Sequence, residues 1–310
     1  GYLDLEQTDP ALDAFGEILE AHPESEFARD ASVRIAQSLE DDGRKQEAAL
    51  AWASFSRAFP TDPDAPAALM KSVDAFAELG DEQRSEDLES EFLDRYPGET
   101  ETVMEIRESR ARRELDRSGI GLLAAGTSAD LTAYLELAAG NPELASPAIL
   151  AEVDFLRAEE LREEYTRIRL TQPLDASIEA KKDKLEDLLE AYGQCTQRQV
   201  ASWAHASAYR IGEILVAFGD ALLDSERPAD LNADELLAYD EVLEEQSWTF
   251  HDRGEEAWNE LLRQNPPGSK DPGDWLERTR DELWPRVARR FLHQPAATYP
   301  RLDAEPPAGE

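Results

Sequence analysis

A repeat of 37 residues is the feature of this sequence that most constrains its fold. Three segments end in histidine, phenylalanine or tyrosine followed by proline, and the prolines Pro23, Pro60 and Pro97 are each 37 residues apart. The glycines Gly43 and Gly80 keep the same offset. A period of this length is typical of a supersecondary unit that stacks against copies of itself along the chain.

Each unit is predicted to be a helical hairpin. Ser25 is placed to cap a first helix, whose small and apolar residues recur every three or four positions, and Gly43 is expected to end it. A second helix follows and stops at Pro60, because proline lacks a hydrogen-bond donor and restricts the residue before it. Trp52 and Phe55 are expected to pack into the neighbouring hairpin, so that the units share one core.

These residues resemble the tetratricopeptide repeat (TPR) family over residues 8–97. Five of them match the family's pattern when the closing prolines are superimposed: Leu39, Gly43, Ala48, Trp52 and Pro60. The bulky Phe55 departs from the pattern, since it stands where the family usually has alanine, and the repeat is longer than the usual ~34 residues. The longer form that ends in aromatic-Pro resembles the TPR units of bacterial envelope proteins, such as outer-membrane assembly lipoproteins and Tol-system TPR proteins.

The resemblance implies an all-α, right-handed solenoid that acts as a non-catalytic protein-interaction scaffold. It also implies a place in a bacterial cell-envelope complex, periplasmic or outer-membrane-associated, with the cytoplasm as the alternative. In the family, the first helices of successive hairpins line a concave surface that holds a partner. The matching positions are Asp30, Val33, Gln37, Glu40, Asp41, Met70, Asp74 and Glu78. They suit a basic or amphipathic protein segment, but an ordinary solvated helix face has the same composition.

The net charge of the chain limits the kinds of molecule that it is expected to bind. The chain has 68 acidic and 32 basic residues, a formal net charge of −36. We expect no nucleic-acid binding, because phosphates would be repelled, and no attraction to anionic membranes. No run of about 18 apolar residues predicts a membrane span. The acidity fits either a solvated shell, as in salt-adapted proteins, or an acidic groove; the one basic stretch, 284–291, is expected to pack within the chain or to dock on an acidic face.

Beyond Pro97 the repeat is not continued, and helices of unequal length are predicted. Residues 1–97 are expected to hold the repeats, 98–146 a divergent repeat and a linker with a small-residue loop near 119–128, and 147–293 long helices with a closing hairpin. Residues 294–310 are predicted to be a disordered tail. No segment alternates with period two for long enough to predict a strand. The expected long helices span about 149–168, 174–192, 203–222, 236–262 and 275–292.

Nothing in the sequence predicts catalysis. No metal-binding histidine pair, phosphate-binding glycine loop or nucleophile elbow is present, so we expect no enzyme activity, no cofactor and no metal. Cys195 has no basic neighbour before Arg198, which indicates a buried or incidental thiol. Two alternatives to a scaffold stay open, a homo-oligomeric structural subunit and the accessory TPR part of an enzyme whose catalytic domain lies elsewhere. Because the chain opens at Gly1 without methionine, we expect a longer or processed protein.

Overall fold

The computed structural model describes residues 8–118 and 129–292, and these residues form an all-α protein. Within these ranges there are helices and turns but no strand, and consecutive helices pack on one another, as in a solenoid. This confirms the predicted fold class. The loop near 119–128 and the tail after residue 294, which the sequence also predicted, lie outside the described residues.

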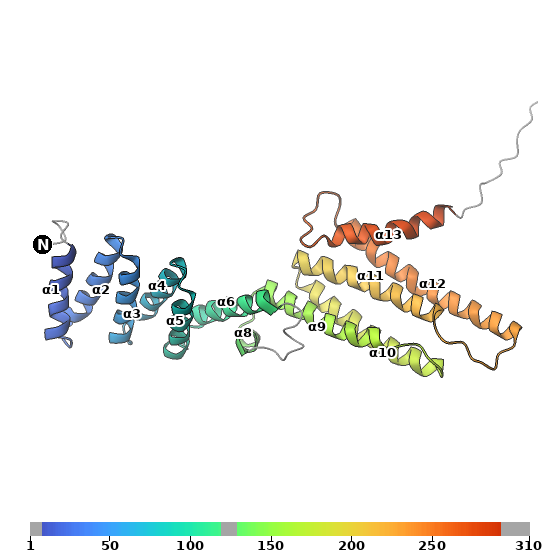
Figure 1. Cartoon of the computed structure of the whole chain (residues 1–310), viewed down its shortest axis with the longest axis horizontal. Helices are drawn as coiled ribbons and strands as arrows, with labels where there is room; N and C mark the ends of the chain where they lie inside the picture. Colours follow the sequence, from blue (N-terminus) through green and yellow to red (C-terminus); the bar gives the residue numbers. More distant parts are fainter. Residues whose placement is uncertain (1–7, 119–128, 293–310) are drawn as a thin grey trace, which may run out of the picture. The chain divides into compact units, whose positions relative to one another are not determined.

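Contacts divide the chain into two compact units. Unit 1 comprises Gly1–Glu114 and Ala129–Ala145, and unit 2 comprises Leu115–Ser128 and Ser146–Glu310. In unit 1, α1 to α5 stand side by side in a row (Figure 1), each packed on the next. The helices that begin in unit 1 are α1 (Thr8–Ala21), α2 (Glu26–Asp41), α3 (Lys45–Ala58), α4 (Ala65–Glu78), α5 (Glu82–Arg95), α6 (Thr100–Ser118) and α8 (Ala129–Gly140).

The 37-residue period is kept by the helices of unit 1. Helices α1, α3 and α5 have 14 residues each, and each begins 37 residues after the one before. Gly43 and Gly80 form equivalent turns, with φ of 74° and 75°, a region that side-chain-bearing residues rarely adopt. The residue after each glycine donates its N–H back to the preceding helix, to Leu39 O and to Phe76 O, both at 2.9 Å. The turn glycines were therefore predicted correctly.

One core cluster joins α2 to α6 in unit 1. Trp52 is 6% exposed and Phe55 is fully buried, and both pack with apolar residues of α4 and α5. The expectation that these aromatics are shared between hairpins is confirmed. The predicted side-chain cap is wrong: Ser25 lies at the N-cap of α2, but its hydroxyl makes no cap hydrogen bond. The Ser25 carbonyl oxygen instead accepts from Ala28 N at 3.1 Å, so the backbone alone closes this turn.

Unit 2 is built from five long helices. They are α9 (Pro147–Arg167), α10 (Leu174–Gln197), α11 (Ala201–Leu223), α12 (Ala233–Gln264) and α13 (Trp275–Leu292). Helices α9 to α12 run lengthwise beside one another, and α13 packs on α11 and α12 (Figure 1). Helix α11 lies between α10 and α12 and has more buried residues than the other helices of this unit, because its sequence is largely apolar.

Helices α11 and α12 approach very closely, and glycine makes this contact possible. A Cβ atom at Gly212 would lie 2.2 Å from Nε1 of Trp258, and one at Gly254 would lie 2.8 Å from the carbonyl oxygen of Gly212. The Trp258 indole donates to the carbonyl oxygen of Tyr209 at 3.0 Å, which fixes the ring against the glycine. The pairing of these two helices therefore depends on the absence of side chains at particular positions.

Candidate functional site

A pocket of about 300 Å³ opens in unit 1 where the repeat brings three helices together. It is bounded by the last turn of α2, the first two turns of α3 and the last two turns of α4. The residues that line it are Glu40, Lys45, Ala48, Ala49, Trp52, Lys71, Asp74, Ala75 and Glu78. The small side chains of Ala48, Ala49 and Ala75 leave this space open between the larger ones.

Trp52 forms the apolar wall of this pocket. Its indole Nε1 donates a hydrogen bond of 2.7 Å to Oε1 of Glu40 on α2. The ammonium group of Lys71 on α4 lies 4.1 Å from the centre of the indole ring, a cation–π contact. The Trp52 ring is thus held in place by Glu40 of α2 on one side and by Lys71 of α4 on the other.

Five charged residues line the pocket, and Asp74 is the one among them without a hydrogen bond, ion pair or ring contact in the described part of the chain. Lys45 Nζ lies 2.9 Å from Oε2 of Glu78, which joins α3 to α4, and Glu40 accepts from the indole. Within the described residues, no hydrogen bond or ion pair reaches the Asp74 carboxylate. The Asp74 side chain is exposed at the pocket rim, but partial desolvation there, and then the negative charge of Glu78, raise its pKa above its usual value. The pocket therefore holds a carboxylate whose charged form lacks a counter-charge.

The structure brings only some of the sequence-predicted residues to this pocket. Glu40, Asp74 and Glu78 line it, whereas Gln37 and Asp41 are exposed outside the set of lining residues, and Asp30 lies 3.4 Å from Arg29. Val33 and Met70 are half-buried and pack against the core cluster. They serve the core as well as the surface, so the apolar contact that the pocket offers comes from Trp52 instead.

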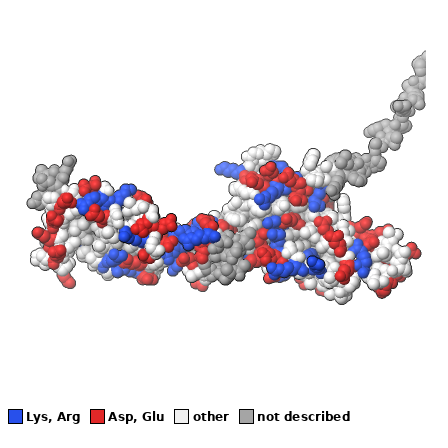
Figure 2. Space-filling model, viewed as in Figure 1, with Lys and Arg blue, Asp and Glu red and all other residues white. Residues whose placement is uncertain are grey.

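Lys45 and Lys71 are pocket residues that sequence reasoning missed. Figure 2 shows basic and acidic side chains interspersed over the visible face of this unit, so the surface is not uniformly acidic. No sequence signal marked these lysines, because they come from α3 and α4 and meet beside Trp52 only in the folded unit. The pocket is therefore amphoteric, with an aromatic wall and one unmatched carboxylate.

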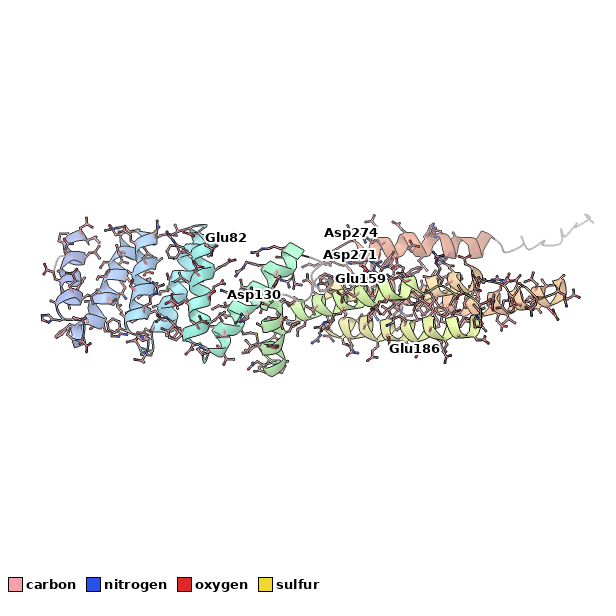
Figure 3. All side chains as sticks on the ribbon, turned by 60° about the horizontal axis from the view of Figure 1, so that its bottom comes forward. Glu82, Asp130, Glu159, Glu186, Asp271 and Asp274 are labelled. Carbon is pink, nitrogen blue, oxygen red and sulfur yellow. The ribbon has the colours of Figure 1, made fainter. Side chains whose placement is uncertain are left out.

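The charged and polar groups around Glu159 in unit 2 are satisfied by one another. Glu159, inside the helices in Figure 3, is 4% exposed and accepts from Tyr192 Oη at 2.6 Å, from Arg210 Nε at 3.0 Å and from Arg162 Nη2 at 3.0 Å. Burial, and then the charge of Glu159, raise the pKa of Tyr192 above its usual range. Since the buried carboxylate is fully paired, this cluster serves structure and offers no open position to a ligand.

Cys195, which the sequence analysis singled out, and His205 are both buried in unit 2. Cys195 is buried, its thiol donates to the carbonyl oxygen of Ala151 at 3.2 Å, and burial raises its pKa, so the reactive thiolate is disfavoured. His205 Nε2 lies 3.0 Å from Oδ1 of Asn265 in a pocket of about 480 Å³. No group of three or more potential metal ligands occurs in the described part of the chain.

No protein-family model, no curated protein and no solved structure matches this chain. The fold and the site therefore define its class by themselves. It is an all-α protein in which consecutive helices pack as in a solenoid, with a small pocket at a repeat junction. Among the described helices, none has an apolar stretch of the length and purity needed to cross a bilayer.

Proposed function

We propose that this protein is a non-catalytic protein-interaction scaffold, and that its repeat pocket receives a lysine or arginine side chain from a basic segment of a partner protein. The observation that carries this proposal is Asp74. Its carboxylate faces a pocket with an aromatic wall and has no counter-charge, and its pKa is raised. An incoming cation would neutralise Asp74 and would contact the Trp52 ring beside Lys71.

The strength expected of this one contact is modest. A partly exposed ion pair contributes about 0.2–1 kcal/mol, and a cation–π contact at an exposed site adds about 0.5–1 kcal/mol. A partner segment therefore needs further contacts along the first helices of the hairpins, where Gln37 and Asp41 are exposed. This fits a scaffold that binds an extended segment over several repeats rather than a single side chain.

The proposal is tested with a short synthetic peptide in which arginine alternates with proline and leucine, so that it cannot form a helix. We expect it to bind the full chain and Asp74→Asn to weaken binding about threefold, since this variant keeps the shape and removes the charge. Asp94→Asn is the matched control, because Asp94 is an exposed carboxylate of the same unit that does not line the pocket. An equal loss in both variants would mean that only the net acidity of the surface attracts the peptide.

The proposed setting is a bacterial cell-envelope complex, periplasmic or outer-membrane-associated. The support for it is the aromatic-Pro-ended repeat, which is kept by the helix ends at Phe59-Pro60 and Tyr96-Pro97. Cell fractionation of a tagged full-length protein checks this setting. Recovery with the cytoplasmic proteins would contradict it without affecting the scaffold proposal.

A further inference from the structure

One imidazole holds both ends of the loop between α12 and α13. His205 of α11 is 6% exposed. Its Nε2 lies 3.0 Å from Oδ1 of Asn265, the C-cap residue of α12, and its Nδ1 lies 3.6 Å from Oδ1 of Asp271, beside the start of α13 (Figure 3). Residues 265–274, called the α12–α13 loop below, are therefore attached near both ends to a side chain of a third helix.

The two residues that face the imidazole also fix the neighbouring helix ends. Asn265 Nδ2 donates to the carbonyl oxygen of Leu261 at 2.9 Å, and the last carbonyl groups of a helix lack a partner within the helix itself. Asp271 Oδ2 accepts from the backbone N–H groups of Leu276 at 2.8 Å and of Glu277 at 3.4 Å, in the first turn of α13. The imidazole is thus joined to the end of α12 and to the start of α13.

Both atoms that face the ring are hydrogen-bond acceptors. The Asn265 amide cannot be turned round without setting its oxygen against the carbonyl oxygen of Leu261, so Oδ1 faces His205. A neutral imidazole has one N–H and donates to one acceptor, whereas an imidazolium donates to two. Within the described residues, no hydrogen bond reaches the buried atoms His205 Nδ1 and Asp271 Oδ1. A proton on Nδ1 would convert this contact into an ion pair.

The other charged groups near the ring on α12, on the loop and on α13 are paired or exposed. Glu260 of α12 lines the pocket of His205, but its Oε1 accepts from Nε2 of Gln264 at 2.6 Å and its Oε2 pairs with Arg263. The charged residues that flank Asp271 in the loop and in the first turn of α13 are exposed; they are Lys270, Asp274, Glu277 and Arg278.

Helices α9 and α10 also pack on α11. Close to the start of α11, Arg198 and Asp154 pair with each other, with 2.9 Å between Nε and Oδ2. Helix α10 contributes the uncharged Thr196 to the pocket of His205. Asp271 is therefore the charge that decides whether the ring holds a second proton.

We propose that His205 is a pH-sensitive latch, whose doubly protonated ring holds the α12–α13 loop and the start of α13 against α11. The attachment to Asn265 is already a hydrogen bond, so the proton on Nδ1 is the one that binds Asp271, and its loss to solvent releases that residue. Helix α13 provides most of the lining of a pocket of about 600 Å³ opposite Leu262 of α12, so the latch makes the shape of this pocket depend on pH. This device lies in unit 2 and goes beyond the function proposed above.

NMR of the full chain with isotopically labelled histidine measures the protonation of the ring, and a His205→Gln variant assigns its signals. Histidine side chains titrate between about pH 5 and pH 8, so we expect both ring nitrogens of His205 to carry a proton at the lower limit and one at the upper limit. In Asp271→Asn the second proton should leave at lower pH, because the carboxylate that holds it is absent.

Hydrogen exchange of backbone N–H groups measures the release of the loop. Leu276 and Glu277 donate to Asp271, so their exchange, corrected for its intrinsic dependence on pH, should become about tenfold faster as the ring loses its second proton, the effect of one lost charge-assisted hydrogen bond. In His205→Gln the exchange should already be fast at acid pH and should show no such step, because the side chain cannot take up a proton.

His251→Gln is the matched control. His251 of α12 also lies beside a carboxylate, with 2.8 Å between its Nε2 and Oδ1 of Asp220, but it stands outside the α12–α13 loop and the pocket of His205. We expect this variant to keep the step in exchange. Circular dichroism checks that the variants stay folded, and the titration of the wild-type ring tests the latch even where a variant does not fold.

Any of four outcomes would overturn this inference. A ring with a single proton at about pH 5 would mean that a neutral imidazole serves both neighbours. A ring that keeps both protons at about pH 8 would make the ion pair permanent over this range. A step in exchange that His205→Gln leaves unchanged would assign the pH dependence to another group. A ring that titrates without any step in exchange would separate its proton from the α12–α13 loop.

Discussion

At the scale of single residues, the third repeat replaces an aromatic contact with an ionic one. Glu89 stands 37 residues after Trp52, is 5% exposed, and lies 2.8 Å from Arg110 Nε and 2.8 Å from Arg113 Nη2. Arg110 and Arg113 in turn stand 37 residues after Val73 and Phe76, which belong to the apolar core cluster. Three positions have thus changed together, so that the buried carboxylate keeps two partners and the helices stay in contact.

Removal of Glu89 should destabilise unit 1 strongly. Glu89→Ala removes the buried partner of two guanidinium groups, which keep the longer ion pairs of Arg110 with Asp130 at 3.9 Å and of Arg113 with Glu86 at 3.6 Å. Breaking a buried pair from one side costs about 3–5 kcal/mol, which is the upper limit here because the Arg113 side chain is 35% exposed. Urea unfolding measures the change, and Glu82→Gln, an exposed carboxylate at the start of α5 (Figure 3), is the control, expected within about 0.5 kcal/mol of the wild type. A loss below about 1 kcal/mol for Glu89→Ala would show that the arginines find water or other acceptors.

The Asp74 carboxylate should make the free energy of unfolding depend on pH. Its pKa is raised in the folded protein, so between its ordinary value of 3.8 and the raised value the folded state binds more protons than the unfolded state. The contribution of Asp74 to the free energy of unfolding is therefore largest at acid pH and declines as the pH rises through this window. Unfolding curves at several pH values should show this decline in the wild type relative to Asp74→Asn. A difference between the two proteins that does not vary with pH would contradict the raised pKa.

At the scale of helices, the sequence predicted where most helices begin and end, but not which helix surfaces pack on one another. The 37-residue period, the turn glycines and the closing prolines located α2 to α5, and apolar periodicity located α9 to α13. Helix α12 even begins with the reciprocal hydrogen bonds of a capping box between Asn232 and Glu235. Which surfaces meet was not predictable, because a contact such as that of Gly212 with Trp258 joins residues far apart in the chain. The Asp74 pocket was missed in part for the same reason, since its lysines come from two different helices.

The close packing of α11 on α12 makes a sharp comparison possible between two glycines in helices. Gly254→Ala would place a methyl group 2.7 Å from Val216 Cγ2 and 2.8 Å from the carbonyl oxygen of Gly212, so we expect a loss of about 1–3 kcal/mol. Gly193→Ala in α10 meets nothing within 4 Å and should stabilise the protein by about 0.5–1 kcal/mol through helix propensity. Thermal unfolding of both variants checks this. If Gly254→Ala instead raised the unfolding temperature, α11 and α12 would have to move apart without loss of stability, which would contradict this expectation.

At the scale of the whole molecule, the excess of acidic residues does not produce a uniformly acidic surface. Basic side chains form ion pairs across unit 1: Arg57 Nη2 of α3 lies 2.6 Å from Glu91 Oε2 of α5, and Arg29 Nε of α2 lies 2.7 Å from Asp62 Oδ2 in the turn before α4. The net charge of −36 does not distinguish a general acidic shell from a specific acidic site. The carboxylates that have no ion-pair partner are the ones that could form such a site. Asp74 combines such a carboxylate with a pocket and an aromatic wall.

The most direct test of the scaffold proposal is the NMR signal of the Trp52 indole N–H, assigned with a Trp52→Phe variant, during titration with the arginine–proline–leucine peptide. If a cationic side chain enters the pocket, this signal shifts progressively in the wild type and in Asp94→Asn, and the shift needs a higher peptide concentration in Asp74→Asn. A Trp52 signal that stays in place while the peptide binds elsewhere on the chain would contradict the proposal.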